Sequence, residues 1–144
     1  IDLSNNTELS ELDLSGNNLT TIDLSNNVNL KLLNLRNECS ECSTMQISSI
    51  DLSNNPLLEE IQLYRNKIES IDLSNNPDLR HIHLRAHNFS NVDLSANTAL
   101  IEEIDFSDNP GPDGNSATPD ILIPQAIYDQ VESAGGILLG VTGG

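Results

Sequence analysis

A hexapeptide, Ile-Asp-Leu-Ser-Asn-Asn, recurs along most of the chain. It begins at Ile1, Ile22, Ile50 and Ile71, and a variant of it begins at Val92. Three of the four intervals are 21 residues long, and the interval from Ile22 to Ile50 is 28. A unit of this length cannot bury its apolar face alone and must stack on its neighbours. The period therefore predicts a solenoid.

A second motif, Leu-x-x-Leu-x-Leu-x-x-Asn-x-Leu, lies midway through each period. It runs through Leu9, Leu12, Leu14, Asn17 and Leu19, through Leu58, Ile61, Leu63, Asn66 and Ile68, and through Leu79, Ile82, Leu84, His87 and Phe89. This spacing is the leucine-rich-repeat consensus. On these residues the chain resembles bacterial leucine-rich-repeat proteins of the short, 21-residue type and is similar to the internalin-J-like surface proteins. The resemblance implies a right-handed solenoid in an extracellular or cell-surface setting.

Each turn is expected to have two extended edges, because apolar and polar residues alternate in both motifs. One is the repeat strand near Leu12–Leu14, and the other is the opposite edge at Ile22–Ser25. Strands of successive turns should stack in parallel about 4.8 Å apart. We expect an α/β repeat fold that is mainly β. It should comprise a solenoid over residues 1–109, with an insertion loop near 37–46, and a C-terminal helix-plus-strand cap or atypical last repeat over 110–144.

Two columns of polar residues mark the points where the chain turns. One contains Asn6, Asn27, Asn55, Asn76 and Asn97, and the other contains Asn17, Asn66 and Asn109, with His87 in the place of one Asn. Backbone groups lose water at such points, and an Asn side chain can satisfy both N–H and C=O groups. We interpret both columns as structural and expect a backbone hydrogen bond from His87.

The 28-residue unit contains an inserted polar loop with two cysteines. Cys39 and Cys42 could be half of a zinc site, a redox pair or a local disulfide. A zinc site needs two further ligands, and no second Cys pair exists. A redox pair belongs at a helix N-terminus, which this loop does not offer. We favour a disulfide between Cys39 and Cys42, as expected of a secreted protein, over free thiols.

The repeat gives way to a Pro- and Gly-rich connection after residue 109. The segment 124–136 then predicts a helix, with Pro124 at its first position and Gly135-Gly136 at its end. Its apolar face contains Ile127, Val131 and Ala134. Ile137–Val141 predicts a last buried strand. These elements would cover the slice of core that the end of a solenoid exposes.

The outward positions of the repeat strand vary from turn to turn, although packing does not demand this variation. All six Lys and Arg residues and all three His lie on this strand or just after it, in a chain whose net charge is −16. We interpret the strand face as a candidate recognition surface. Its candidate ligand-binding residues are Lys31, Arg36, Tyr64, Arg65, Arg80, His81, His83 and Arg85.

Charge pairing is the alternative explanation for these basic residues. The register places Arg80 between Glu59 and Glu102, and opposite charges on adjacent strands stabilise by about 0.2–1 kcal/mol per pair. Pairing does not explain Tyr64, which we expect to be exposed in the same column as Arg85. Tyr and Arg are the residues that most often anchor interfaces.

Two groups of side chains raise the question of a metal ion. His81 and His83 project from one face, but an exposed strand rarely closes a tetrahedral zinc site. We predict no metal there and only a mild pH response. On the opposite edge a column of carboxylates contains Asp2, Asp23, Asp51, Asp72 and Asp93. Either Ser, Asn and backbone donors offset their repulsion, or cations such as calcium collect there.

No nucleophile, base and orienting group converge, so the sequence predicts no enzyme and no cofactor. The negative charge argues against nucleic acid or an anionic membrane as partner, and no apolar run could span a bilayer. The chain begins within a repeat, so we expect an excerpt of a longer protein. We predict a monomeric module that binds a protein or glycan ligand, and the resemblance implies a role in adhesion. The alternative is a structural repeat spacer within a larger surface protein, with calcium as a candidate stabiliser.

Overall fold

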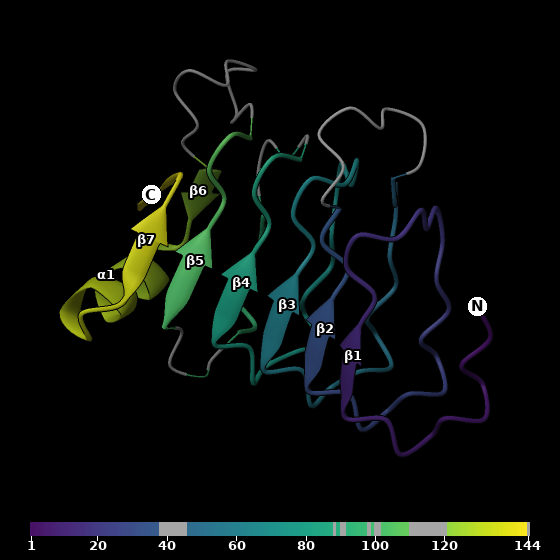
Figure 1. The fold of residues 1–144 in the computed structure, drawn as a ribbon. Coiled ribbons are helices and arrows are strands. Elements are labelled where there is room, and N and C mark those ends of the chain that lie inside the picture. The colour runs from purple at the N-terminus through teal and green to yellow at the C-terminus, as the bar shows by residue number, and fades with distance from the viewer. Residues whose placement is uncertain are drawn as a thin grey trace.

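The computed structural model describes residues 1–37, 46–87, 89, 92–97, 99, 102–109 and 121–143. These ranges contain the strands β1 (Glu11–Asp13), β2 (Leu32–Asn34), β3 (Glu60–Gln62), β4 (His81–His83), β5 (Glu103–Asp105), β6 (Ile121–Ile123), β7 (Ile137–Leu139) and β8 (Val141–Gly143), and the helix α1 (Gln125–Ser133). Six strands form one parallel sheet in the order β1-β2-β3-β4-β5-β7 (Figure 1). β6 and β8 form a second, two-stranded parallel sheet.

The strand register follows the repeat. The central residues of the six strands pair in one row, which runs through Leu12, Leu33, Ile61, Ile82, Ile104 and Leu138. A slip of one residue would turn each buried side chain to solvent, so the apolar pattern fixes this register. The predicted solenoid with a parallel strand face is confirmed.

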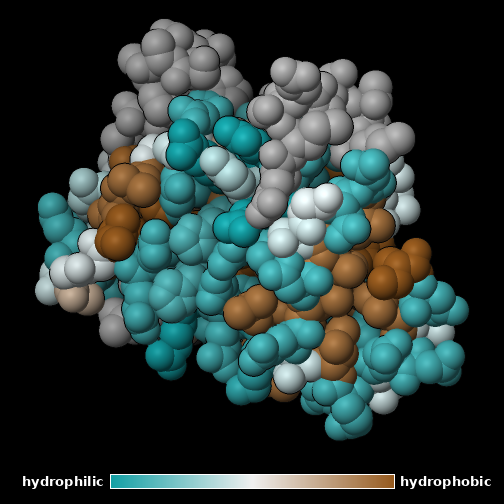
Figure 2. Space-filling model, in the orientation of Figure 1, coloured by the Kyte–Doolittle hydropathy of each residue, from teal (hydrophilic) through white to brown (hydrophobic). Residues whose placement is uncertain are grey.

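The core is one stack of mainly aliphatic layers. Leu63, Leu84 and Phe106 occupy the same position in successive turns and are completely buried. Leu14 holds that position in the first described turn and is only half-buried, since within the described chain only the following turn stacks against it. Figure 2 shows the resulting hydrophobic surface at the N-terminal end. Burial therefore increases from the first turn towards the middle of the stack.

The opposite edge is held by turns and an Asn ladder. No strand forms at residues 22–25, where the sequence predicted a second extended edge, and the chain instead turns at Ser25. The side-chain Nδ2 atom of each ladder Asn donates to the backbone carbonyl of the one before it. These distances are 2.9 Å from Asn55 to Asn27, 2.9 Å from Asn76 to Asn55 and 2.8 Å from Asn97 to Asn76. The donor half of the role predicted for this column is confirmed, whereas the buried Oδ1 atoms of Asn27, Asn55, Asn76 and Asn97 accept no hydrogen bond from the described residues.

The second polar column bonds to the backbone with both donor and acceptor atoms. Asn66 donates through Nδ2 to the carbonyl of Leu63 at 2.7 Å and accepts through Oδ1 from the N–H of Ile47 at 3.0 Å. One turn later, both ring nitrogens of His87 form hydrogen bonds with backbone groups. Its Nε2 lies 2.7 Å from the carbonyl oxygen of Leu63, and its Nδ1 accepts from the N–H of Ile68 at 3.2 Å. The backbone hydrogen bond expected of His87 is confirmed.

The residue before this column adopts a left-handed backbone in four of the turns. The φ angles are 69° at Gly16, 58° at Arg65, 57° at Ala86 and 61° at Asp108. Glycine takes this conformation freely, whereas an L-residue is strained by about 1–2 kcal/mol. The strain belongs to the repeat geometry and not to one special site.

Replacing Ala86 by Gly should raise the free energy of unfolding by about 0.5–1 kcal/mol. Relief of the left-handed strain should exceed the cost of a more flexible unfolded chain. Urea unfolding at neutral pH measures the difference. Ala126→Gly, on an exposed position of α1, is the matched control and should instead destabilise by about 1 kcal/mol. A loss of stability in Ala86→Gly would contradict this backbone assignment.

The C-terminal helix begins one residue later than predicted. Pro124 immediately precedes α1, and Gly135 follows its end with a φ of 73°. Ile127 and Val131 are buried, as expected of the apolar face. Ala134, which the sequence also placed on that face, is exposed.

The strand predicted at 137–141 is in fact two strands separated by Gly140. This glycine has a φ of 67°, and a Cβ atom there would lie 2.5 Å from the backbone nitrogen of Ser107. β7 joins the large sheet beside β5, but Ile137 and Leu139 are exposed and not buried as predicted. β6 was not predicted.

The insertion leaves the stack intact on its C-terminal side. Gln46 donates to the carbonyl of Arg65 at 2.8 Å, and Ile47 is again in the core. The disulfide predicted between Cys39 and Cys42 lies outside the described residues. In the part of the chain that the structure describes, no helix is long and apolar enough to cross a membrane.

Candidate ligand-binding face

The strand face is the surface formed by the outward side chains of β1 to β5 and β7 and the residues beside them. Two columns of outward side chains follow from the register. One contains Glu11, Leu32, Glu60, His81, Glu103 and Ile137, and the other contains Asp13, Asn34, Gln62, His83, Asp105 and Leu139. The middle of this face is hydrophilic in Figure 2, and hydrophobic surface appears at its β7 end.

The basic residues on and just before β4 contact the acidic residues on and just before β5. Arg80 Nη1 lies 3.5 Å from Glu102 Oε1, and His81 Nε2 lies 3.7 Å from the other oxygen of that carboxylate. His83 Nδ1 lies 3.9 Å from Glu103 Oε1. The two His distances are too long for hydrogen bonds. The charge pairing considered as an alternative does occur, although His81 approaches Glu102 and not its register neighbour Glu103.

A similar pair joins the residues that immediately precede β2 and β3. Lys31 Nζ donates to Glu59 Oε1 at 2.9 Å, and this hydrogen bond lowers the pKa of Glu59. Both side chains are about half exposed, so solvent screens the attraction and the pair adds about 0–1 kcal/mol of stability. Lys31 and Arg80 are therefore engaged in weak surface pairs.

Tyr64 is the centre of the cluster that charge pairing does not explain. The guanidinium carbon of Arg65 lies 5.2 Å from the centre of the Tyr64 ring, and that of Arg85 lies 5.6 Å from it. Both distances suit cation–π contacts. The sequence predicted an exposed Tyr64, but the side chain is half-buried in the structure. We name Tyr64, Arg65 and Arg85 the Tyr64 cluster.

The two arginines of this cluster differ in their other contacts. Arg85 donates to Asp108 Oδ2 from Nε at 2.7 Å, and its Nη2 lies 2.6 Å from the same oxygen. The guanidinium of Arg65 has no ion pair with any described residue. Arg85 is thus held in position, whereas Arg65 presents a cation over an aromatic ring.

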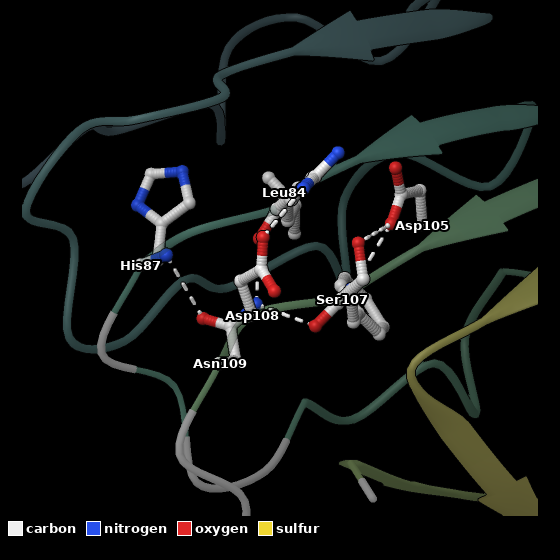
Figure 3. Close-up of polar contacts among 8 residues, drawn as sticks. Leu84, His87, Asp105, Ser107, Asp108 and Asn109 are labelled. Carbon is white, nitrogen blue, oxygen red and sulfur yellow. Dashed lines mark hydrogen bonds and ion pairs between the residues drawn. The ribbon is translucent and has the colours of Figure 1, made fainter. Parts of the chain in front are cut away.

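Asn34 connects Arg36 to the first turn. The backbone N–H of Arg36 donates to Asn34 Oδ1 at 3.2 Å, and Asn34 Nδ2 donates to Asp13 Oδ2 at 3.0 Å. Hydrogen bonds from Ser15 are the main reason that the pKa of Asp13 is lowered, and Arg36 adds a smaller electrostatic contribution. Asp105 accepts from both the hydroxyl and the N–H of Ser107 in the equivalent place, at 2.6 Å and 3.0 Å (Figure 3).

The Asp column on the opposite edge uses its carboxylates locally. Each one accepts a hydrogen bond from the backbone N–H of the Ser two residues later, at 2.8–3.0 Å. Hydrogen bonds from that Ser lower the pKa of each carboxyl group. Shallow open hollows lie between turns along this edge, for example between Asp23 and Asp51. The serine donors offset the repulsion within the column, which is the first of the two explanations considered.

The described residues contain no group of three or more His, Cys, Asp or Glu side chains that could hold a metal ion. His81 and His83 therefore have no third ligand close enough in that part of the chain. The Asp column shows no such grouping either. The geometry of the described residues gives no support to a calcium-stabilised spacer.

Sequence reasoning missed two features of this face. Asp108 follows the last consensus strand and neutralises Arg85, but its position outside the strand gave no signal. Ile137 and Leu139 occupy outward positions that are mostly polar in the preceding turns. Their alternation within the run Ile-Leu-Leu could have indicated a strand with two outward apolar residues.

The in-register strands, the apolar layers and the Asn ladder together define a leucine-rich-repeat-like solenoid, mainly β with one C-terminal helix. Among solved structures it is similar to the functional domain of InlJ from Listeria monocytogenes, which is described as including a cysteine ladder. The TM-score is 0.71 at 21% identity, and the match covers 93% of this chain but only 26% of that one. The sequence matches no protein-family model, and no curated protein is significantly similar to it. At this identity the similarity shows the fold.

Proposed function

We propose that this chain is a non-enzymatic binding module that recognises a protein or glycan ligand through its strand face, in an extracellular or cell-surface setting. The observation that carries the proposal is the Tyr64 cluster, an aromatic ring with two arginines against it on a surface where packing requires neither. Tyr and Arg are enriched, together with Trp, among the residues that form binding hot spots. The leucine-rich-repeat-like fold is often used for protein binding, and the rigid sheet holds these side chains in place.

The other basic residues of the face have a smaller role in this proposal. Lys31 and Arg80 have carboxylate partners just before the neighbouring strand, and Arg85 has Asp108 beyond β5. A ligand that displaced these weak pairs would gain little, because the solvent-exposed carboxylates left behind would offset the gain. Arg65 and the Tyr64 ring can instead be contacted without breaking an ion pair among the described residues.

A screen against arrays of glycans and extracellular proteins tests the proposal. The double variant Tyr64→Ala/Arg65→Ala should weaken binding of any captured ligand about 30-fold or more, the effect of losing one hot spot of about 2 kcal/mol. Tyr64→Phe keeps the ring and should bind nearly as well as the wild type. Lys31→Ala/Arg80→Ala is the matched control, because it also removes exposed residues from this face.

Two outcomes would contradict the proposal. One is a ligand that binds the Tyr64→Ala/Arg65→Ala variant as tightly as the wild type, with circular dichroism showing both to be folded. The other is no captured ligand at all, together with free exchange of the strand-face residues. That second outcome would favour the structural spacer.

A further inference from the structure

Arg65 places a positive charge on the strand face without a carboxylate partner among the described residues. Its guanidinium carbon lies 5.2 Å from the centre of the Tyr64 ring. A cation–π contact uses the flat face of a guanidinium group, whereas the N–H donors project from its edge. The Arg65 side chain is only partly buried. Its N–H donors are therefore accessible to an acceptor from outside the chain.

The backbone that carries this side chain is fixed by the turns on both sides of it. The N–H of Arg65 donates to the carbonyl of Arg85 at 3.1 Å, and the carbonyl of Arg65 accepts from Gln46 Nε2 at 2.8 Å. The carbonyl of Tyr64 accepts from the N–H of Asn37 at 2.9 Å. A ligand that binds side chains on a fixed backbone pays less conformational entropy. Tyr64 and Arg65 are thus preorganised for recognition.

A second guanidinium group lies against the same ring. That of Arg85 is 5.6 Å from the centre of Tyr64, so two like charges are held close together and repel each other. Asp108 neutralises Arg85 through contacts of 2.7 Å and 2.6 Å. The nearby Asp105 accepts hydrogen bonds within its own turn. An external anion that binds Arg65 would therefore balance the second of the two charges.

Polar side chains surround the Tyr64 cluster on the strand face. The adjoining outward column contains Gln62, His83 and Asp105 on β3 to β5. The core of a protein–protein interface is depleted of charged residues and enriched in apolar area, so these neighbours do not suit a protein partner. Amide, imidazole and carboxylate groups instead offer donors and acceptors to hydroxyl groups. These surroundings suit a sugar.

The net charge of the chain limits how many negative charges such a ligand can carry. At −16 the protein repels a densely charged polyanion, and physiological salt screens that repulsion only beyond about 8 Å. A single carboxylate in contact with Arg65 gains the local attraction and meets little of the repulsion. The charge distribution therefore favours a mainly neutral glycan with isolated acidic sugars.

We propose that the Tyr64 cluster is a subsite for the carboxylate of an acidic sugar within an otherwise neutral glycan. This inference rests on the proposed function and specifies the ligand of the same face. The carboxylate accepts hydrogen bonds from the N–H edge of Arg65, whose planar fork matches its two oxygens. Tyr64 holds that guanidinium group in place, and the sugar hydroxyl groups extend towards Gln62 and His83.

Titrations of the isotope-labelled wild type, followed by NMR, test the proposal with matched sugars. The acidic probes are sialyllactose and a trisaccharide that ends in glucuronic acid, and the neutral probes are their methyl esters and lactose. At least one acidic probe should bind and shift the amide signals of Tyr64 and Arg65. Its methyl ester should bind about 10-fold more weakly or less, because esterification removes the charge-assisted hydrogen bonds.

Two variants should change the affinity for that sugar in opposite directions. Arg65→Ala should raise its Kd about 10-fold or more, and Arg65→Lys should give an intermediate value, because lysine keeps the charge but lacks the fork. Asp108→Asn removes the nearest competing carboxylate and should lower the Kd about 2- to 5-fold. Asn tolerates the left-handed backbone of that position. Arg80→Ala, before β4, is the matched control and should bind like the wild type.

The proposal is overturned if neither acidic probe binds, or if the methyl esters bind as tightly as the acids. The ester comparison uses only the wild type, so it decides the question even if Arg65→Ala fails to fold. Binding of an oligoglutamate peptide in place of the sugars, lost in Arg65→Ala, would overturn the acidic sugar and leave the proposed function standing. The proposed function itself fails when a captured ligand is insensitive to Tyr64→Ala/Arg65→Ala.

Discussion

Replacing Leu84 by Ala should lower the free energy of unfolding by about 2–5 kcal/mol. The side chain is completely buried between equivalent residues of the turns on either side, Leu63 and Phe106. Neither neighbouring layer can collapse into the space, because the Asn and His columns and the parallel sheet fix the distance between turns. The lost transfer energy and the cavity therefore both contribute in full.

The position of this residue in the stack should also affect cooperativity. In a solenoid each turn is stabilised by contacts with its two neighbours, so weakening one layer uncouples the turns on either side. Urea unfolding should show a lower midpoint and a shallower slope for Leu84→Ala than for the wild type. A loss below about 0.5 kcal/mol would contradict the assigned burial.

Leu14→Ala and Leu57→Ala are matched controls for this measurement. Leu14 has the same place in the consensus as Leu84, but it lies in the first turn and is half-buried, so its loss should be clearly smaller. Leu57 is 41% exposed, and its replacement should change stability by less than about 0.5 kcal/mol. The series Leu84, Leu14, Leu57 should therefore rank by burial alone.

The fold could be predicted from the sequence because the residues that determine it recur in several repeats. Ile61 and Ile82 have the same apolar position one period apart, and nothing but an in-register parallel pair keeps both buried. The Asn ladder followed by the same logic, since Asn55 and Asn76 recur where backbone groups lose water. The structural role of residues that recur at a fixed period and meet one physical requirement can be inferred from the sequence alone.

The parts that occur once could not be predicted in this way. His81 approaches Glu102 at 3.7 Å and not its register neighbour, because long exposed side chains select partners among several of nearly equal energy. The break at Gly140 depends on close approach to the backbone of Phe106 and Ser107, which only the folded chain brings together. The candidate site also occurs only once, since Arg85 pairs with Asp108 of the adjacent turn.

The stability of the protein should fall by about 3 kcal/mol between pH 7 and pH 4 because of one residue, His87. Burial lowers the pKa of His87 from 6.5 to about 4, and the hydrogen bond to Leu63 opposes this shift only in part. The unfolded chain therefore binds a proton between these two values that the folded chain does not. Within that window the free energy of unfolding falls by about 1.4 kcal/mol for each unit by which the pH decreases. Above about pH 6.5 the stabilising contribution of the neutral His87 ring is fully present.

The geometry around the ring explains why protonation is unfavourable. Nδ1 accepts a hydrogen bond from the N–H of Ile68, so a proton on Nδ1 would place two donors face to face. Nε2 already donates to Leu63, which fixes the neutral tautomer. Phe89 lies beside the ring, with 5.0 Å between ring centres, and offers no acceptor. The folded protein can bind the proton only by breaking part of the column.

The variant His87→Asn should remove this pH dependence and keep the fold. Asn109 shows that an Asn in this column can satisfy the same kinds of backbone group, since its Oδ1 accepts from the N–H of His87 at 3.1 Å (Figure 3) and its Nδ2 donates to the carbonyl of Leu84 at 2.8 Å. An amide does not titrate, so urea unfolding of His87→Asn at pH 7, 5.5 and 4.5 should give nearly constant free energies.

The lowered pKa values of Asp13, Asp51 and Asp72 act in a separate window. Stability from these carboxylates is present above their ordinary value of 3.8 and is lost only as the pH falls below it. Both His87→Asn and the wild type should therefore lose stability together in strong acid, while only the wild type loses it between pH 6.5 and 4. The surface double variant His81→Asn/His83→Asn is the control that measures how much of the slope belongs to the strand face. If His87→Asn keeps the wild-type slope and the surface double variant abolishes it, the pH response belongs to the strand face and not to the buried column.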